Sequence, residues 1–134
     1  AADRAHHVET KIKPALASGK VVLSDRYFDS SVAYQGAARE LDVQEVKDIS
    51  LWAIDRLLPD LTVLLDLPAQ EAMNRRGNKG TEPDRLEREQ VEFFERARDE
   101  YLRMANEPRF LVVDANLSPE EIHSQVLQRV AKLS

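Results

Sequence analysis

The sequence lacks cysteine altogether and contains only four glycines among its 134 residues. Without cysteine, disulfides and thiolate metal sites are excluded, and nothing marks the chain as secreted. No apolar run approaches the roughly 20 residues that cross a bilayer, and no signal peptide is visible. The formal net charge of −5 argues against nucleic acid or an anionic membrane as the main partner. We therefore expect a cytoplasmic protein in which any anion site is a local group of arginines and lysines.

Helical and extended patterns alternate along the chain. Apolar residues at helical spacing predict a first helix that closes at Ser18-Gly19 and is bent or limited by Pro14. Short apolar runs predict three buried strands, at Val21–Leu23, Leu61–Leu65 and Phe110–Val113. Helical patterns predict the remaining elements at about 30–38, 42–58, 86–106 and 118–133, with a short helix after the second strand. The expected helix caps are Ser30 or Ser31, Asp42 with Glu45, and Ser118 with Pro119 and Glu121.

This alternation predicts an α/β fold with a parallel sheet in a single domain over 1–134. Each expected strand ends in an aspartate, namely Asp25, Asp66 and Asp114. Ligands of such sheets bind beyond the carboxyl ends of the strands, although Asp66 and Asp114 fit a helix cap or a turn equally well. A charged loop with two glycines and a proline, at about 75–87, is unable to pack a core.

The stretch after the first expected strand carries the strongest chemical signal. Arg26 can grip a phosphate bidentately, and the neighbouring Asp25 can hold a hydrated Mg²⁺. A polar helix with Tyr34 and Gln35 follows at once. The arrangement suits a phosphorylated substrate, whereas an isolated Asp-Arg pair would be read as a surface ion pair.

Several motifs together resemble the thymidylate kinase family along the whole chain. The motif Asp-Arg-Tyr alone is common. Its combination with Ala-Tyr-Gln-Gly at this spacing and with a later Asp-Arg-Leu-Glu is highly specific for one family. The matching segments are Ala2-Asp3-Arg4-Ala5-His6-His7, Ser24-Asp25-Arg26-Tyr27, Ser30-Ser31-x-Ala33-Tyr34-Gln35-Gly36, Asp84-Arg85-Leu86-Glu87 and Val113-Asp114-Ala115. The resemblance implies a three-layer parallel sheet of the P-loop nucleoside monophosphate kinase type. It also implies phosphoryl transfer from ATP to dTMP, giving dTDP and ADP for dTTP biosynthesis.

The resemblance implies a role for each residue of a dTMP site. Arg4 is expected to contact a carbonyl oxygen of thymine, and Ser31 to hydrogen-bond to the pyrimidine. Arg26 is expected to hold the 5′-phosphate. Tyr34 is expected to lie under the deoxyribose and disfavour a 2′-hydroxyl, and Gln35 to add a polar contact near the nucleotide.

The metal and the aromatic residues beside this site have further expected roles. Asp25 resembles a Walker-B carboxylate that orders Mg²⁺ or its waters. Tyr27 and Phe28 either wall the base pocket or pack the core. Trp52 is either deeply buried or part of a subunit contact, and the family resemblance implies a homodimer.

The charged loop resembles the lid that closes over ATP in related enzymes. Closure would place a cation on the transferring phosphoryl group, with Arg76 preferred over Arg75 and Lys79. Arg85 and Glu87 are expected to orient the lid or the acceptor site. Ala115 and Asn116 fall where related kinases pass beside adenine, and Asn116 fits a turn equally well.

The phosphate-binding loop of the family is not found in the sequence, since no G-x-x-x-x-G-K-[ST] occurs. Backbone amides and the lysine of that loop cradle the donor phosphates. The chain also begins with Ala1 inside an expected helix. We therefore expect the carboxyl-terminal two-thirds of an enzyme, inactive by itself. The alternatives are another P-loop nucleoside or nucleotide kinase and a non-catalytic nucleotide-binding or dimerisation module.

Overall fold

The computed structural model describes residues 1–39, 41–75 and 85–133, and for 85–87 it describes the backbone alone. The chain forms two compact units, Ala1–Leu58 and Pro59–Ser134. Each unit has its own arrangement of elements. The expectation of one domain stays a prediction.

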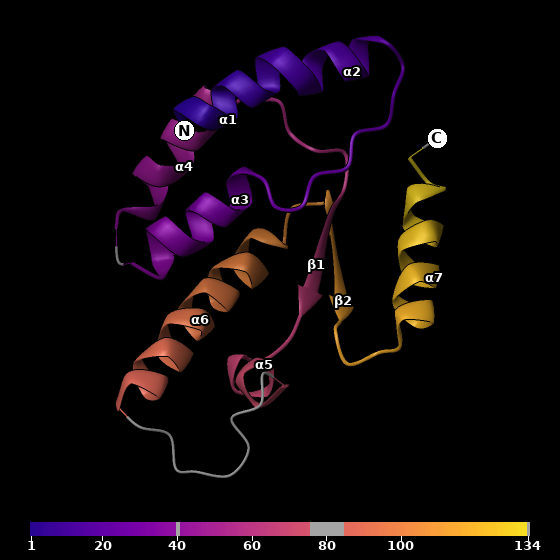
Figure 1. Ribbon diagram of the computed structural model, residues 1–134. Coiled ribbons are helices and arrows are strands. Elements are labelled where there is room, and N and C mark those ends of the chain that lie inside the picture. The colour runs from indigo at the N-terminus through magenta and orange to yellow at the C-terminus, as the bar shows by residue number, and fades with distance from the viewer. Residues whose placement is uncertain (40, 76–84, 134) are drawn as a thin grey trace. The chain divides into compact units, whose positions relative to one another are not determined.

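The first unit begins with one continuous helical run (Figure 1). It comprises α1 (Ala2–His7), the π-helical turn η1 (Val8–Ile12) and α2 (Lys13–Ala17). Pro14 has no N–H to donate, and the wider i→i+5 turn lies directly before it, where the amide of Lys13 bonds to the carbonyl of Val8. Val8 and Ile12 are buried, and the run ends in the turn at Ser18-Gly19, as the sequence predicts.

The predicted strand Val21–Leu23 is wrong, because residues 20–24 form neither a strand nor a helix. Val21 is 89% exposed and Leu23 is 93% exposed. A parallel strand is stabilised by hydrogen bonds to its neighbours and by cover on both faces, and an apolar β-branched run supplies neither by itself. Three residues form too few ladder bonds to hold an extended segment alone.

The helix after this segment begins earlier than expected. It comprises α3 (Phe28–Ser31) and the π-helical turn η2 (Val32–Ala37), with Tyr27 rather than a serine at the N-cap position. Next comes α4 (Val43–Ala53), whose Asp42 cap accepts a hydrogen bond from the amide of Glu45 at 2.9 Å, as the sequence predicts.

Gly36 explains how α4 packs against η2. A Cβ atom placed on this glycine would lie 3.3 Å from the Cα atom of Val43, so any larger residue would push the two helices apart. The buried residues of this unit include Phe28, Val32, Ala33 and Ile54. This core holds η2, and therefore the side chains of its outer face, in a fixed position.

The second unit contains a two-stranded parallel sheet, which confirms the α/β prediction. Strand β1 (Thr62–Asp66) pairs with β2 (Phe110–Asp114), and Asp66 stands opposite Asp114. The crossover contains α5 (Ala69–Arg75) and α6 (Arg85–Met104), and α7 (Pro119–Val130) follows β2. Figure 1 shows α6 on one side of the strand pair and α7 on the other.

The start of α7 agrees with the sequence in detail. The hydroxyl of Ser118 accepts a hydrogen bond from the amide of Glu121, and the Glu121 carboxylate accepts one from the amide of Ser118. These reciprocal bonds are a capping box. The hydrogen bonds that the Glu121 carboxylate accepts from the amide and the hydroxyl of Ser118 hold the pKa of Glu121 below its usual value. The strands are less buried than expected, since Leu65 and Val112 are exposed.

Candidate functional site

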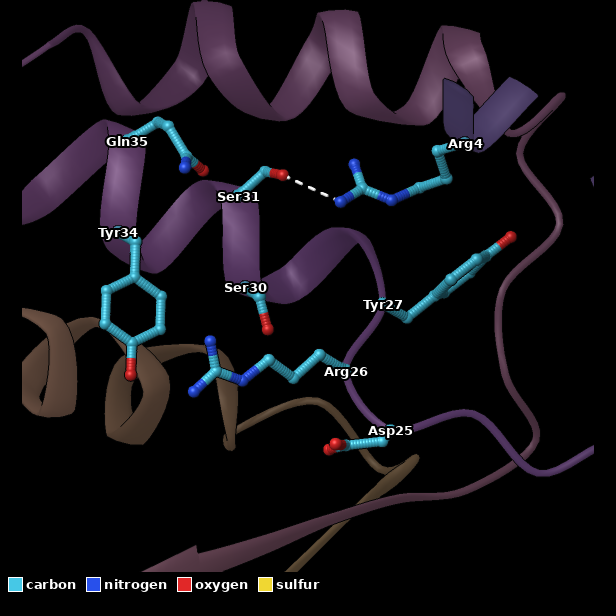
Figure 2. Close-up of a pocket in the computed structure, with 8 residues that line it drawn as sticks. All are labelled: Arg4, Asp25, Arg26, Tyr27, Ser30, Ser31, Tyr34 and Gln35. Atoms are coloured by element: carbon cyan, nitrogen blue, oxygen red, sulfur yellow. Dashed lines mark hydrogen bonds between the residues drawn. The ribbon is translucent and has the colours of Figure 1, made fainter. Parts of the chain in front are cut away.

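The first unit contains a cavity of about 360 Å³ lined by eight residues of the sequence motifs. Its walls come from α1, from the segment before α3, and from α3 and η2 (Figure 2). Five of the residues predicted to bind the acceptor, together with the predicted metal ligand, lie in this lining. The lining residues are Arg4, Asp25, Arg26, Tyr27, Ser30, Ser31, Tyr34 and Gln35.

Arg26 reaches into the cavity from a left-handed backbone conformation, with φ of 64°. Its guanidinium carbon lies 5.3 Å from the centre of the Tyr34 ring, which is close enough for a cation–π interaction. No hydrogen bond or ion pair of this guanidinium to the described residues is seen. Its N–H groups are therefore available to an anion in the cavity.

Arg4 and Ser31 meet at the opposite wall, as Figure 2 shows. A guanidinium nitrogen of Arg4 donates to the hydroxyl of Ser31 at 3.0 Å, which joins α1 to α3. The family resemblance implies that both residues contact the base of the same ligand, and the fold brings them together from 27 positions apart. A rigid helix on each side fixes this pair of polar groups.

Tyr27 and Phe28 have different surroundings. Phe28 is 1% exposed and belongs to the core. Tyr27 lines the cavity, and its hydroxyl donates to the carbonyl of Leu57 at 3.2 Å. Burial raises the pKa of this phenol, so it remains protonated and holds the chain reversal after α4.

Two serines, one in the cavity lining and one just outside it, have no binding role in the sequence prediction. Ser30 lies in the lining, whereas the sequence predicts only a helix cap for it. Ser24 donates its hydroxyl to the carbonyl of Arg26 at 2.8 Å. Its place beside the Asp-Arg motif was the only available signal, because the left-handed turn cannot be read from residue types.

The aspartates that end the two described strands have structural partners. Asp66 accepts two hydrogen bonds from Arg98 of α6, at 2.7 and 3.0 Å, which lower the pKa of its carboxyl. Asp114 accepts a hydrogen bond from the amide of Asn116 at 2.8 Å, as in a turn. Their surroundings match the cap and turn alternative rather than a ligand site.

Arg75 and Asn116 are brought together in the second unit. The Arg75 guanidinium donates to the carbonyl of Ala115 at 3.2 Å and to the side-chain oxygen of Asn116 at 2.5 Å. The side-chain nitrogen of Asn116 donates to the carboxylate of Glu71 at 3.0 Å. The end of α5 is thus tied to the loop after β2. The other predicted lid groups, Arg76 and Lys79 and the side chains of Arg85 and Glu87, lie outside the described residues.

Among the described residues, no three His, Asp or Glu side chains gather where a metal ion could be held. Magnesium does not require such a cluster, since it commonly keeps several waters and binds one or two carboxylates together with substrate phosphates. Asp25, on the cavity wall beside Arg26, fits that mode of binding. None of the described helices is long and apolar enough to cross a membrane.

Two arginines, several hydroxyls and a carboxylate line one small cavity, a combination of groups suited to a phosphorylated small molecule. Comparison with known proteins identifies the family. The chain belongs to the thymidylate kinase family, whose model, described as "Thymidylate kinase", matches residues 1–126.

Curated relatives agree with this family assignment. The thymidylate kinase of Leifsonia xyli subsp. xyli is 58% identical over 131 residues, which cover 97% of this chain and 62% of the relative. That of Clavibacter michiganensis subsp. michiganensis is 56% identical over 135 residues, covering 99% and 64%. That of Halothermothrix orenii is 51% identical over 132 residues, covering 97% and 64%. The chain thus spans less than two-thirds of the length of these relatives.

Proposed function

We propose that the intact protein transfers a phosphoryl group from ATP to dTMP, giving dTDP and ADP in nucleotide biosynthesis. The observation that supports this most directly is the cavity in which Arg4, Arg26, Ser31 and Tyr34 converge. Relatives at 51–58% identity bear the name thymidylate kinase, which names the same substrate.

The phosphate end of dTMP is assigned to Arg26. Its guanidinium presents parallel N–H groups that match two oxygens of a phosphate. The Tyr34 ring holds that guanidinium from one side and places an aromatic wall where the deoxyribose would lie. Asp25 would hold Mg²⁺ through water, and the ion would neutralise phosphate charge when bound.

The base end of dTMP is assigned to the opposite wall. Thymine presents carbonyl oxygens that accept hydrogen bonds and a ring N–H that donates one. Arg4 can donate to a carbonyl oxygen, while the Ser31 hydroxyl can donate or accept. Their mutual hydrogen bond at 3.0 Å holds both groups ready before a base is bound. Gln35, exposed on η2, adds a polar contact at the rim.

The ATP side is assigned to the loop at Ala115 and Asn116 and to the lid at about 75–87. Arg75 bonds to that loop, so we assign it to the adenine side rather than to the transferred phosphoryl group. Arg76 is then the preferred lid cation, with Lys79 as the alternative. Arg85 and Glu87 are assigned to orienting the lid.

No general base is needed for this reaction. The acceptor is already a phosphate oxygen, so it carries no proton that must be removed at neutral pH. Catalysis then depends on bringing donor and acceptor together and on neutralising the charge that develops on the phosphoryl group. Arg26 and the lid cation are the groups of this chain proposed to do so.

A cytoplasmic homodimer is proposed as the working form. The outer face of α4 supports this, because Ile49 is 57% exposed and Trp52 is 81% exposed. Large apolar side chains side by side on a helix surface are typical of a protein contact. Trp52 lies at the surface rather than in the core, which supports the subunit contact over deep burial.

The proposed function is tested with the purified intact protein, ATP, Mg²⁺ and a panel of nucleoside monophosphates. Formation of dTDP should depend on dTMP, and dUMP or dCMP should react far more slowly. Arg26→Ala should abolish most of the turnover, whereas His123→Ala, an exposed change on α7, should leave it unchanged. Equal rates with all monophosphates would contradict the assignment of thymine to the Arg4 wall.

A further inference from the structure

A left-handed backbone at Arg26 is unusual, because a side chain beyond glycine crowds the neighbouring carbonyl there. Such conformations persist only where surrounding groups fix them, and they concentrate at functional sites. Arg26 is also the residue on which the phosphate end of the cavity depends. The groups that hold the Arg26 backbone in this conformation therefore affect how well the cavity can bind a phosphate.

Among the described residues, two groups contact Arg26, one at each end of the residue. The Tyr34 ring contacts the guanidinium, and the Ser24 hydroxyl donates a 2.8 Å hydrogen bond to the backbone carbonyl. The side-chain contact cannot by itself fix the backbone, because several rotatable bonds separate the two. The Ser24 bond spans only two residues and acts directly on the turn.

We propose that Ser24 is a positioning residue, which holds Arg26 in the left-handed conformation that aims its guanidinium into the cavity. Ser24 does not line the cavity and touches no ligand in this assignment. It acts through Arg26 alone. Losing the hydroxyl would let the 24–27 segment relax to commoner backbone conformations, in which the arginine head spends less time over Tyr34.

The consequence is specific to the phosphate end of the ligand. A nucleotide with a 5′-phosphate would lose affinity when Arg26 is misplaced, whereas thymidine, which has no phosphate, would bind as before. A hydroxyl that only stabilised the fold would weaken both ligands together. The ratio of the two affinities therefore separates positioning from general stability. This inference rests on the proposed binding of dTMP.

The experiment measures Kd for dTMP and thymidine by calorimetry on the intact protein. Ser24→Ala should raise Kd for dTMP about three- to tenfold, the usual worth of one neutral hydrogen bond, and change Kd for thymidine by less than about twofold. Ser24→Thr, which keeps the hydroxyl, should restore the wild-type ratio. Ser24→Val, with nearly the shape of Thr, should behave like Ser24→Ala.

Ser18 provides a matched control in the same unit. Its hydroxyl also donates to a backbone carbonyl at 2.8 Å, that of Ala15, in an exposed turn outside the cavity lining. Ser18→Ala should leave both affinities unchanged. If it lowers dTMP affinity as much as Ser24→Ala does, the effect is general and the inference is wrong.

The remaining outcomes are also decisive. If the wild-type protein binds dTMP no more tightly than thymidine, the proposed function is wrong. If the wild-type protein prefers dTMP and both Ser24→Ala and Ser24→Val keep that preference, the proposed function is supported but the role of Ser24 is wrong. Unfolding of both hydroxyl-free variants, seen as loss of circular dichroism, would make Ser24 structural and likewise overturn the inference.

Discussion

The ion pair between Asp66 and Arg98 offers a quantitative test of the second unit. Two hydrogen bonds, at 2.7 and 3.0 Å, join the end of β1 to α6, and the two side chains are 22% and 28% exposed. Exposed ion pairs contribute about 0–1 kcal/mol, and breaking a fully buried pair costs about 3–5 kcal/mol. The partial burial places this pair between these limits, so Asp66→Asn should lower the free energy of unfolding by about 2 kcal/mol.

The pH dependence follows from the direction of the pKa shift. Hydrogen bonds from Arg98 lower the pKa of Asp66 in the folded state. The stabilisation is therefore fully present above the ordinary carboxyl pKa of about 3.9 and is lost as pH falls through the lower, folded value. The difference between wild type and Asp66→Asn should stay constant from about pH 8 to 5 and shrink below about pH 4.

Urea unfolding followed by circular dichroism at several pH values measures this difference. Asp114→Asn is the matched control, because Asp114 stands opposite Asp66 in the sheet, and an asparagine can still accept the hydrogen bond from the amide of Asn116. The control should change stability by less than about 0.5 kcal/mol. Equal losses in the two variants, or a difference unchanged at pH 3, would refute the reasoning.

Four further results are expected. Arg26→Ala should cost about 1.5–3 kcal/mol of phosphate interaction, seen in calorimetry as a rise of roughly tenfold or more in Kd for dTMP; an unchanged Kd removes Arg26 from the site. Tyr34→Ala should weaken discrimination between deoxyribose and ribose acceptors in competition assays, and unaltered selectivity would count against its place under the sugar. The 134-residue chain by itself should convert no dTMP to dTDP, since its sequence has no Gly-rich phosphate loop, and measurable turnover would contradict this. Trp52→Ser should weaken self-association at least tenfold in sedimentation experiments, whereas an unaffected dimer would place the interface elsewhere.

Features that depend on a few neighbouring residues are predictable from this sequence. Ser118, Pro119 and Glu121 predict the start of α7, because every bond of the capping box lies within four positions. The apolar runs predict β1 and β2 to within a residue. The family motifs predict five residues for one acceptor site, and all five line the same cavity. Residues that form one site recur together in a family's motifs, so the motifs indicate which distant residues meet in the fold.

Features that depend on a distant partner are not predictable in the same way. The run Val21–Leu23 has the composition of a buried strand but forms none, because strand formation depends on neighbours that composition does not specify. The π-helical turns are also missing from the prediction, since apolar spacing does not separate them from α-helix. Nothing in the local sequence indicates that Arg98, rather than another arginine of α6, bonds to Asp66.

The contrast between Arg98 and Arg26 explains why one arginine is structural and the other is suited to a ligand. Arg98 gives its N–H groups to carboxylates, so its charge is already balanced within the unit. Arg26 is held over the face of Tyr34, which balances part of its charge through the ring but accepts none of its in-plane hydrogen bonds. A guanidinium held in this way is fixed in place while its donors remain available for a phosphate. Whether the contacts that hold an arginine leave its N–H groups available therefore decides what the arginine can bind.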